Sequence, residues 1–271
     1  MSKYNNYLII SDLDGTLINS QHTISEKNLA AIEAFTANGG RFAVATGRSI
    51  QNIRPFIKNL RLNGPCILYN GAAVYDFKGE RILKAEFLKK EILVDYINYC
   101  LATYHNMVVE IFTPEGMFII SPEKNTDAYV VKEKQPFTRS ELKEVLKLDW
   151  LKLMLYDKHH TLAEARQAFM KFGLEADFDD VFSHEFYFEV LKKGISKGSA
   201  LQSLRSMEPF RNKTILAVGD YDNDIEMVSL ADVGIAVENA REGVKAVAKR
   251  ITVSNDRDAM HEIICNILPE L

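Results

Sequence analysis

The chain has 271 residues, 47% hydrophobic and 26% charged, which is ordinary for a globular protein of one or two domains. Its 33 basic and 37 acidic residues give a formal charge of −4, which argues against nucleic acid as a partner. Three separated cysteines without a CxxC pair argue against a disulfide framework or a zinc site and favour a reducing compartment. The sequence has no apolar run as long as a membrane span and no signal-peptide core near residue 1. We therefore expect a cytoplasmic protein with no membrane partner.

The first third of the chain alternates between expected strands and helices. Residues 7–10 predict a buried strand, and Thr23 and Glu26 have the spacing of a capping box that starts a helix ending at residues 39–40. The next expected elements are a strand at 42–45, a helix at 49–60 and a strand at 66–69. Strands that alternate with helices in this way are typical of a parallel sheet.

The pattern changes between residues 84 and 187, where adjacent strands are paired. Helices are expected at 91–104, 140–147 and 161–172, and strands at 107–112, 117–120, 150–156, 181–184 and 186–191. Paired strands with helices between them indicate an antiparallel α+β unit. We therefore predict an inserted domain at 84–191, between two segments of a first domain at 1–83 and 192–271, with hinges near 81–86 and 191–194.

The first pattern resumes after Gly194. Strands are expected at 214–218, 233–237 and 251–253, and helices from 196, at 225–230, at 240–248 and at 259–268. The predicted fold class is therefore α/β, with a Rossmann-like core around a parallel sheet and an inserted α+β domain with an antiparallel sheet.

Two carboxylates follow the first expected strand. Asp12 and Asp14 lie one residue apart and are followed by Gly15, which allows a sharp turn. Taken alone, this pattern is more typical of a turn with solvated aspartates. In an open α/β sheet, however, ligands bind beyond the carboxyl ends of the strands, where other polar residues would meet this pair.

Polar side chains also occur at other expected strand ends and at one expected helix start. They are Thr46, Gly47 and Arg48; Lys197; and Asp220, Asn223 and Asp224. Carboxylate oxygens suit Mg²⁺, whereas the sequence has no His/Cys set with zinc spacing. A magnesium ion, an ammonium and a hydroxyl are the groups that stabilise a transferring phosphoryl group. One aspartate could act as nucleophile and a second carboxyl as general acid and base.

These motifs resemble the four motifs of haloacid dehalogenase (HAD) superfamily phosphatases, in the Cof-type subgroup that has a type IIB (C2) cap. Asp12-Leu-Asp14-Gly-Thr16 resembles the first motif, Ala45-Thr46-Gly47-Arg48 the second, Lys197 the third and Gly219-Asp220-Tyr-Asp-Asn223-Asp224 the fourth. The turn at Asn70-Gly71 and the segment Val237-Glu-Asn239-Ala240 also fit the subgroup, while Asp256-Arg-Asp-Ala-Met260 departs from it because a glycine is more usual after the acids.

The resemblance implies a role for each matched residue. Asp12 would attack phosphorus, and Asp14 would protonate the leaving alcohol and then activate water. The Asp12 carboxylate, the Asp14 carbonyl and Asp220 would hold Mg²⁺, with Asp224 as a supporting ligand. The phosphoryl group would be held by Thr46, Gly47, Lys197 and Asn223, while Arg48, Asn70 and Gly71 would face the substrate.

The resemblance does not identify the substrate, nor whether water or a sugar accepts the phosphoryl group. A Mg²⁺-dependent phosphatase for small phosphorylated metabolites, with sugar phosphates first, is the main expectation, and the state expected is a monomer or a small homo-oligomer. The alternatives are a hexose-phosphate mutase and a non-catalytic binding module. Mutase caps tend to carry arginines for a distal phosphate, and the insert has only Arg139 and Arg166. His184 and Glu185, at an expected turn of the insert, are further candidates for substrate selection.

Overall fold

The computed structural model describes residues 2–271 apart from the side chain of His184. The chain forms two compact units, which are described separately below. Unit 1 consists of Met1–Arg48, Ile53–Lys84 and Ser196–Leu271, and unit 2 consists of Ser49–Asn52 and Ala85–Ile195. The predicted domain boundaries, 84 and 191, remain predictions. No described helix has the length and apolar character needed to cross a membrane.

Unit 1 contains an eight-stranded sheet of order β14-β13-β12-β1-β2-β3-β4-β5. The strands are β1 (Tyr7–Asp12), β2 (Arg41–Ala45), β3 (Cys66–Leu68), β4 (Ala73–Asp76), β5 (Arg81–Ala85), β12 (Thr214–Gly219), β13 (Val233–Ala236) and β14 (Arg250–Ile251). The strands from β14 to β3 pair in parallel, and β4 pairs antiparallel with β3. The central strands are apolar almost throughout and buried, as expected of a sheet covered on both faces.

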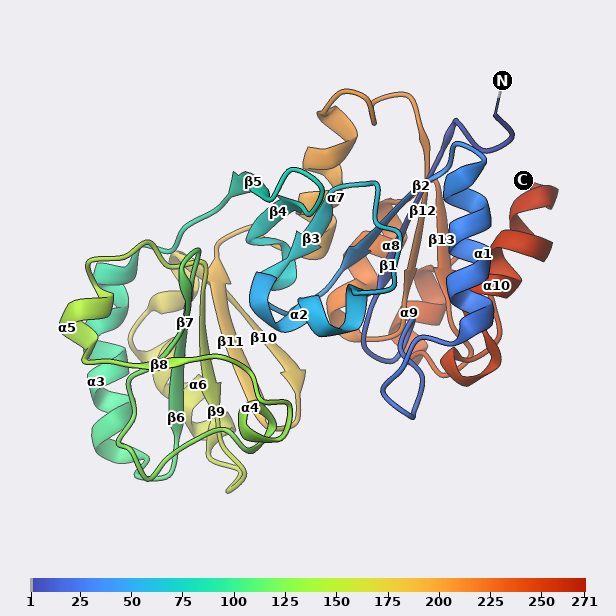
Figure 1. Cartoon of the computed structure of the whole chain (residues 1–271). Helices are drawn as coiled ribbons and strands as arrows, with labels where there is room; N and C mark the ends of the chain where they lie inside the picture. The colour runs from blue at the N-terminus through green and yellow to red at the C-terminus, as the bar shows by residue number, and fades with distance from the viewer. Residues whose placement is uncertain (1) are drawn as a thin grey trace. The chain divides into compact units, whose positions relative to one another are not determined.

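The helices of unit 1 lie on both faces of this sheet (Figure 1). They are α1 (Glu26–Ala37), α2 (Ile50–Ile57, whose first residues belong to unit 2), α7 (Lys197–Ser206), α8 (Ile225–Leu230), α9 (Glu242–Val247) and α10 (Ala259–Glu262). From the central pair of strands, β1-α1-β2 runs toward one edge of the sheet and β12-α8-β13 toward the other. Because both crossovers are right-handed, α1 and α8 cover opposite faces. In Figure 1, α1 and α10 are accordingly seen side by side, away from α7 and α8.

Unit 2 contains a six-stranded sheet of order β10-β11-β9-β6-β7-β8. Its strands are β6 (Val108–Thr113), β7 (Gly116–Ile119), β8 (Thr138–Arg139), β9 (Lys152–Tyr156), β10 (Phe178–His184) and β11 (Tyr187–Lys192). All neighbours pair antiparallel except β7 and β8. The helices are α3 (Val94–Thr103), α4 (Ala128–Lys132), α5 (Leu142–Val145) and α6 (Leu162–Lys171). These features confirm the predicted fold class.

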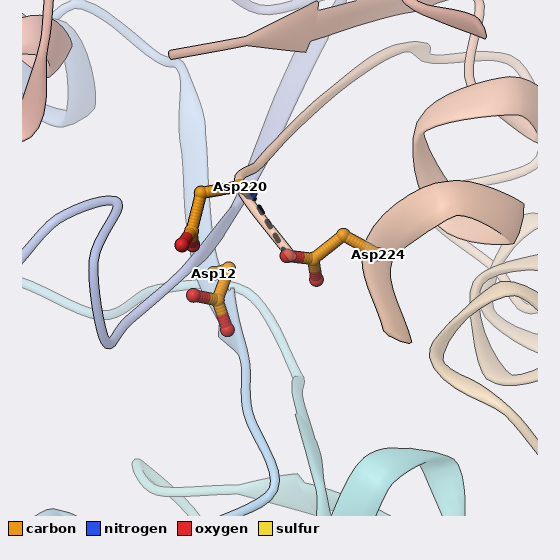
Figure 2. A group of neighbouring side chains, drawn as sticks. All are labelled: Asp12, Asp220 and Asp224. Atoms are coloured by element: carbon orange, nitrogen blue, oxygen red, sulfur yellow. Dashed lines mark hydrogen bonds between the residues drawn. The ribbon is translucent and has the colours of Figure 1, made fainter. Parts of the chain in front are cut away.

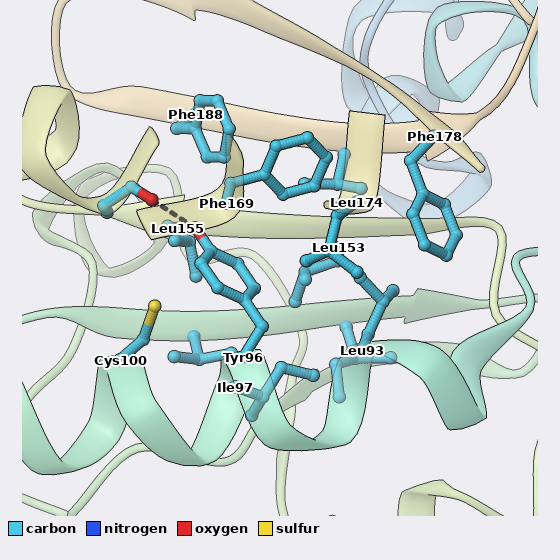
Figure 3. Close-up of a cluster of buried hydrophobic side chains, with 14 of the residues drawn as sticks. Leu93, Tyr96, Ile97, Cys100, Leu153, Leu155, Phe169, Leu174, Phe178 and Phe188 are labelled. Atoms are coloured by element: carbon cyan, nitrogen blue, oxygen red, sulfur yellow. Dashed lines mark hydrogen bonds between the residues drawn. The ribbon is translucent and has the colours of Figure 1, made fainter. Parts of the chain in front are cut away.

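One face of the unit 2 sheet packs against α3 and α6 to form a hydrophobic core (Figure 3). Tyr96 of α3 and Phe169 of α6 meet edge to face, with ring centroids 5.6 Å apart. The Tyr96 hydroxyl donates a 3.0 Å hydrogen bond to the Ala165 carbonyl, so the buried phenol is satisfied. This core holds the strands in register, and their alternate residues point to the opposite face of the sheet.

Several predicted elements differ from those observed. The predicted capping box is wrong, because Ser25 is the N-cap of α1 and accepts a hydrogen bond from the Asn28 amide, while the Thr23 hydroxyl donates to Asn19. The expected helices at 49–60 and 140–147 are shorter, and the sequence did not predict β4, β5, β8 or α4. These missed elements have only two to five residues, so no periodic pattern identifies them.

Candidate active site

The candidate site lies at the carboxyl ends of the two central strands of the unit 1 sheet, β1 and β12. Strands β1 and β12 are parallel neighbours in the middle of the sheet. From β1 the strand order proceeds to β2 on one side, and from β12 it proceeds to β13 on the other. Beyond the carboxyl ends of such a pair, the loops turn in opposite directions and leave a crevice for ligands. Asp12 is the last residue of β1, and Asp220 directly follows β12.

Three carboxylates meet at this point (Figure 2). One oxygen each from Asp12, Asp220 and Asp224 lies within 4.8 Å of the other two. Two backbone amides fix the Asp224 carboxylate, because its Oδ2 accepts hydrogen bonds from the amides of Asp220 (3.0 Å) and Tyr221 (3.2 Å). The Thr16 hydroxyl donates a 2.7 Å hydrogen bond to Asp220. The loop after β1 and the loop after β12 are therefore joined by the hydrogen bond from Thr16 to Asp220.

Lys197 lies between two of these acids. Its ammonium donates hydrogen bonds to Asp12 (2.6 Å) and Asp224 (2.7 Å), and its side chain is only 1% exposed. Lys197 is the first residue of α7, directly after the N-cap Ser196, where a cation is disfavoured by the helix dipole. Burial alone lowers the pKa of Lys197, but Asp12 and Asp224 together raise it above its ordinary value. The lysine is therefore a permanent cation in this site.

One ammonium does not balance three carboxylates. Burial raises the pKa of Asp12 well above its usual range; Lys197 opposes the rise, and Asp224 and Asp220 add to it. Burial, and next the Asp224 charge, raise the pKa of Asp220 to about 6. Both pKa shifts come mainly from burial, and the neighbouring carboxylates add to them. An all-carboxylate donor set of this kind fits Mg²⁺, which prefers oxygen ligands and keeps several waters.

Asp14, two residues after Asp12, pairs with Arg48. The arginine Nε and Nη2 donate to the two carboxylate oxygens of Asp14, each over 2.8 Å. The Arg48 guanidinium also stacks on the Phe56 ring, 4.2 Å from its centroid, and its side chain is 14% exposed, compared with 48% for Asp14. Arg48, which was predicted to face the substrate, and Asp14, which was predicted to act as both acid and base, thus form one bidentate pair.

The other predicted phosphate-binding residues line the loops beside β1. Thr46 is buried after β2, and its hydroxyl accepts a hydrogen bond from the Arg48 amide. The backbone N–H of Asn70 donates a hydrogen bond to the Thr46 carbonyl over 3.1 Å. The side-chain oxygen of Asn70 accepts a 2.9 Å hydrogen bond from the Asn223 side chain. A Cβ on Gly47 would lie 3.1 Å from the side-chain amide of Asn70, so the two residues approach closely. Thr46, Gly47, Asn70 and Asn223 therefore form one connected group, in which Asn70 has φ of 54°.

Close packing requires a glycine at position 71, which the sequence alone did not indicate. Its φ of 108° suits glycine, and a Cβ there would lie 2.1 Å from the Ser196 carbonyl oxygen. Close approach of Gly71 thus seats the start of α7, from which Lys197 projects. A substrate contact by Gly71 stays a prediction, as does one by Glu185, and the side chain of His184 lies outside the described residues.

Sequence reasoning missed the residues that support the two acidic loops. The Asn239 side chain donates a 2.8 Å hydrogen bond to the Gly15 carbonyl, and its oxygen accepts from the Asn255 amide. The Arg241 amide donates to the Asp220 carbonyl over 2.9 Å, and the Arg241 guanidinium stacks on Tyr221. In the sequence, Asn239 matched the subgroup pattern, but that match did not indicate which residues its side chain would contact.

Comparison with known proteins gives matches over nearly the whole chain. The model of the haloacid dehalogenase-like hydrolase family matches residues 9–264. The 5-amino-6-(5-phospho-D-ribitylamino)uracil phosphatase YitU of Bacillus subtilis is 27% identical, over 94% of this chain and 94% of its own length. A solved haloacid dehalogenase-like hydrolase from Bacteroides thetaiotaomicron is 27% identical, with a TM-score of 0.82 over 98% of this chain and 100% of its own.

A further solved structure resembles this chain in fold alone. The HAD subclass IIB sugar phosphatase BT4131 has a TM-score of 0.80 at 20% identity, over 96% of this chain and 98% of its own. Its likeness spans both units described here. The similarity therefore extends to the inserted antiparallel unit as well as to the parallel sheet.

Proposed function

Because the chain belongs to the family of haloacid dehalogenase-like hydrolases and is a phosphatase, we propose that it hydrolyses small phosphate monoesters with Mg²⁺ and through an aspartyl-phosphate on Asp12. The observation that carries the proposal is the buried contact between Lys197 and Asp12, beside the carboxylates of Asp220 and Asp224. The lysine charge favours the ionised form of Asp12 and opposes the burial and the neighbouring acids that raise the pKa of Asp12, and a nucleophile requires the ionised form.

The proposed first step uses Asp12 and Asp14. An oxygen of Asp12 attacks phosphorus, the bond between phosphorus and the ester oxygen breaks, and the leaving oxygen takes a proton from Asp14. In the second step Asp14 takes a proton from water while the water oxygen attacks phosphorus. The bond between phosphorus and Asp12 then breaks, which restores both carboxyl groups and releases inorganic phosphate.

The remaining residues bind and orient the phosphoryl group. Lys197 is the cation nearest the nucleophile and can neutralise phosphoryl charge. Thr46 and Gly47 offer a hydroxyl and a backbone amide, and Asn223 is positioned through Asn70. The carboxylates of Asp12 and Asp220 and the Asp14 carbonyl would hold Mg²⁺, with Asp224 in support. When bound, the ion supplies positive charge to the phosphoryl oxygens.

The arginines of unit 2 favour hydrolysis over transfer to a second sugar phosphate. Arg139 donates to the carbonyls of Ser121 and Asn125, and Arg166 pairs with Asp180. Both guanidinium groups are thus engaged in holding unit 2 together. A mutase needs a cation for the distal phosphate of its substrate, and these two residues are poorly suited to that task.

The substrate class is a small phosphorylated metabolite. The relative YitU is named for a phosphorylated ribitylaminouracil, and the structural neighbour BT4131 is described as a sugar phosphatase. These names have in common a phosphate monoester on a small polyhydroxylated molecule. We propose sugar and sugar-alcohol phosphates as the first substrates to assay, ranked by kcat/KM.

The test is hydrolysis of para-nitrophenyl phosphate with Mg²⁺, after removal of divalent ions with EDTA, and by the Asp12→Asn variant. We expect release of nitrophenolate that requires Mg²⁺ and falls at least about a thousandfold in the variant, because the covalent route is lost. Asp222→Asn, an exposed neighbour of the cluster, is the matched control and should retain activity. Metal-independent hydrolysis, or full activity of Asp12→Asn, would contradict the proposal.

A further inference from the structure

The turn that carries Asp14 is anchored by loops from two outer strands of the unit 1 sheet. In the strand order, β13 and β14 lie on the side of β12 away from β1. Asn239 follows β13 and Asn255 follows β14, yet both side chains reach the backbone of the loop after β1. Asn239 donates a 2.8 Å hydrogen bond to the Gly15 carbonyl, and Asn255 donates a 3.0 Å hydrogen bond to the Ile18 carbonyl. The loops after β13 and β14 therefore reach past the end of β12 to hold the turn.

These anchors are connected to one another. The Asn239 side-chain oxygen accepts a 3.0 Å hydrogen bond from the backbone N–H of Asn255, so Asn239 uses both ends of its amide. The next residue, Asp256, accepts a 2.7 Å hydrogen bond from the backbone N–H of Ser20. A single exposed hydrogen bond contributes little, whereas bonds in a network reinforce one another. The loop at residues 15–20 is thus held at three points by two linked loops.

Asp14 lies inside this anchored turn. The turn closes on itself at Leu13, whose carbonyl accepts hydrogen bonds from the backbone amides of Leu17 (3.1 Å) and Ile18 (2.8 Å). Asp14 directly follows Leu13, and Gly15, whose carbonyl is anchored, directly follows Asp14. The Asp14 backbone is therefore fixed on both sides, by the closed turn before it and by the anchored carbonyl after it. A displacement of the turn would move the Asp14 carboxyl with it.

The nucleophile is held by other contacts. Asp12 is the last residue of β1 and pairs in register with Ala45 of β2. Its carboxylate accepts a 2.6 Å hydrogen bond from Lys197. Neither contact involves the asparagines, so loss of the anchors should disturb Asp14 while Asp12 stays in place.

We propose that Asn239 and Asn255 are positioning residues for Asp14, which hold its carboxyl where it gives a proton to the leaving oxygen and takes one from water. The proposal rests on the acid and base role proposed above for Asp14. It assigns neither asparagine a contact with the substrate, because both bond the backbone of the turn. Misplacing a reacting group by about 1 Å costs about a hundredfold in rate, so bonds that are weak in stability matter for turnover.

Two aryl esters of similar shape separate the work of the acid from that of the nucleophile. Nitrophenolate leaves without a proton, whereas the more basic phenolate of phenyl phosphate needs one. For both esters, kcat/KM reports the steps up to release of the phenol. We expect Asn239→Ala to lower kcat/KM about tenfold for phenyl phosphate and less than about twofold for para-nitrophenyl phosphate. Asn255→Ala keeps the bond from Asn239 to Gly15, so it should shift the same ratio by a smaller factor.

The ratio of the two kcat/KM values measures positioning and not stability, because a loss of folded protein lowers both values by the same factor. Asn212→Ala is the matched control, since Asn212 is exposed in the turn before β12, at the opposite end of that strand. Its ratio should equal that of the wild type. Amide hydrogen exchange gives a readout that needs no activity. Peptides covering residues 13–20 should exchange faster in both variants of the asparagine anchors than in the wild type or Asn212→Ala.

An equal loss of kcat/KM for the two esters in both Asn239→Ala and Asn255→Ala overturns the proposal. Exchange of the turn at the wild-type rate in these variants overturns it as well. Each variant is a separate test, so Asn255→Ala decides the question if Asn239→Ala folds poorly. A wild type that hydrolyses neither ester with Mg²⁺ contradicts the proposed function itself, and this proposal with it.

Discussion

Arg48 holds both carboxylate oxygens of Asp14 through two hydrogen bonds of 2.8 Å. Asp14 is the proposed acid and base, so this pair determines where its carboxyl points. The guanidinium is fixed in turn by stacking on Phe56. We propose that Arg48 positions Asp14, while the predicted contact of Arg48 with the substrate stays a prediction.

Replacing Arg48 tests that positioning role. We expect Arg48→Gln to lower kcat of the Mg²⁺-dependent phosphatase by about tenfold, because a loosely held Asp14 samples more orientations. KM should change less, since the phosphoryl contacts remain. Arg54→Gln, which breaks the exposed pair of Arg54 with Glu80, is the control and should leave kcat unchanged. Equal kcat values for Arg48→Gln and the wild type would show that the pair has no part in turnover.

The two proposed steps place different demands on Asp14. Nitrophenolate leaves without a proton, whereas water needs a base to attack the aspartyl-phosphate. We therefore expect Asp14→Asn to release about one nitrophenolate per active site in a burst and then to turn over slowly. Rapid-quench or stopped-flow absorbance measures the burst. A variant with no burst and an unchanged steady rate would assign the base to another residue.

Lys197 should be as important for stability as for chemistry. Its replacement by methionine leaves Asp12 and Asp224 buried without their cation, and breaking a buried pair costs about 3–5 kcal/mol. Urea denaturation of Lys197→Met measures this loss in the free energy of unfolding. Lys147→Met breaks an exposed pair with Glu144, and its effect should stay below about 1 kcal/mol. Equal stabilities for the two variants would mean that the buried contacts contribute little.

Magnesium should stabilise the fold through the same carboxylates. A ligand that binds only the folded state adds about 2.7 kcal/mol at a hundred times its dissociation constant. We expect Mg²⁺ to raise the melting temperature of the wild type, and to do so much less in Asp220→Asn. Asp222→Asn keeps the cluster of three acids and should respond like the wild type. An undiminished shift in Asp220→Asn would place the ion elsewhere.

Glu110 gives a prediction about pH and stability. Its pKa is raised in the folded state, so the folded chain binds this proton more tightly than the unfolded chain does. The free energy of unfolding should therefore fall as pH rises above about 4.3, the pKa of a glutamate in the unfolded chain. Glu110→Gln removes this loss and should be more stable by about 1–3 kcal/mol at pH 7, with the difference fading toward pH 4.

Chemical denaturation across that pH range measures the difference. Glu115→Gln carries the same change of charge at an exposed position, and its stability should follow the wild type at each pH. A constant difference between Glu110→Gln and the wild type from pH 4 to pH 8 would show that the Glu110 carboxyl does not titrate with folding.

Much of the fold followed from local patterns in the sequence. The buried strands β1 and β12 are continuous apolar runs, and both end at acids, so the parallel sheet and the meeting of Asp12 with Asp220 could be predicted. The same reasoning identified a second, largely antiparallel sheet, because two pairs of its strands follow one another directly, with helices between the pairs. The short strands β4, β5 and β8 carried no such signal.

The contacts within the site were harder to predict, because they depend on loop geometry and register. The pairing of Arg48 with Asp14 joins two loops, and the bond from Asn239 to Gly15 spans 224 residues of sequence. Glu110 looked like one polar residue in an apolar strand. Only the register of β6 with β9 and β11 places it in line with Glu189 across the sheet, with Met154 between them.

The central claim is that Asp12 carries the phosphoryl group during turnover. Acid quenching of the enzyme while it hydrolyses a radiolabelled phosphate monoester, followed by peptide mapping, tests this directly. We expect label on the peptide that contains Asp12, more of it in Asp14→Asn, and none in Asp12→Asn. Turnover with Mg²⁺ that leaves no label on Asp12 in either the wild type or Asp14→Asn, and that persists in Asp12→Asn, would contradict the account.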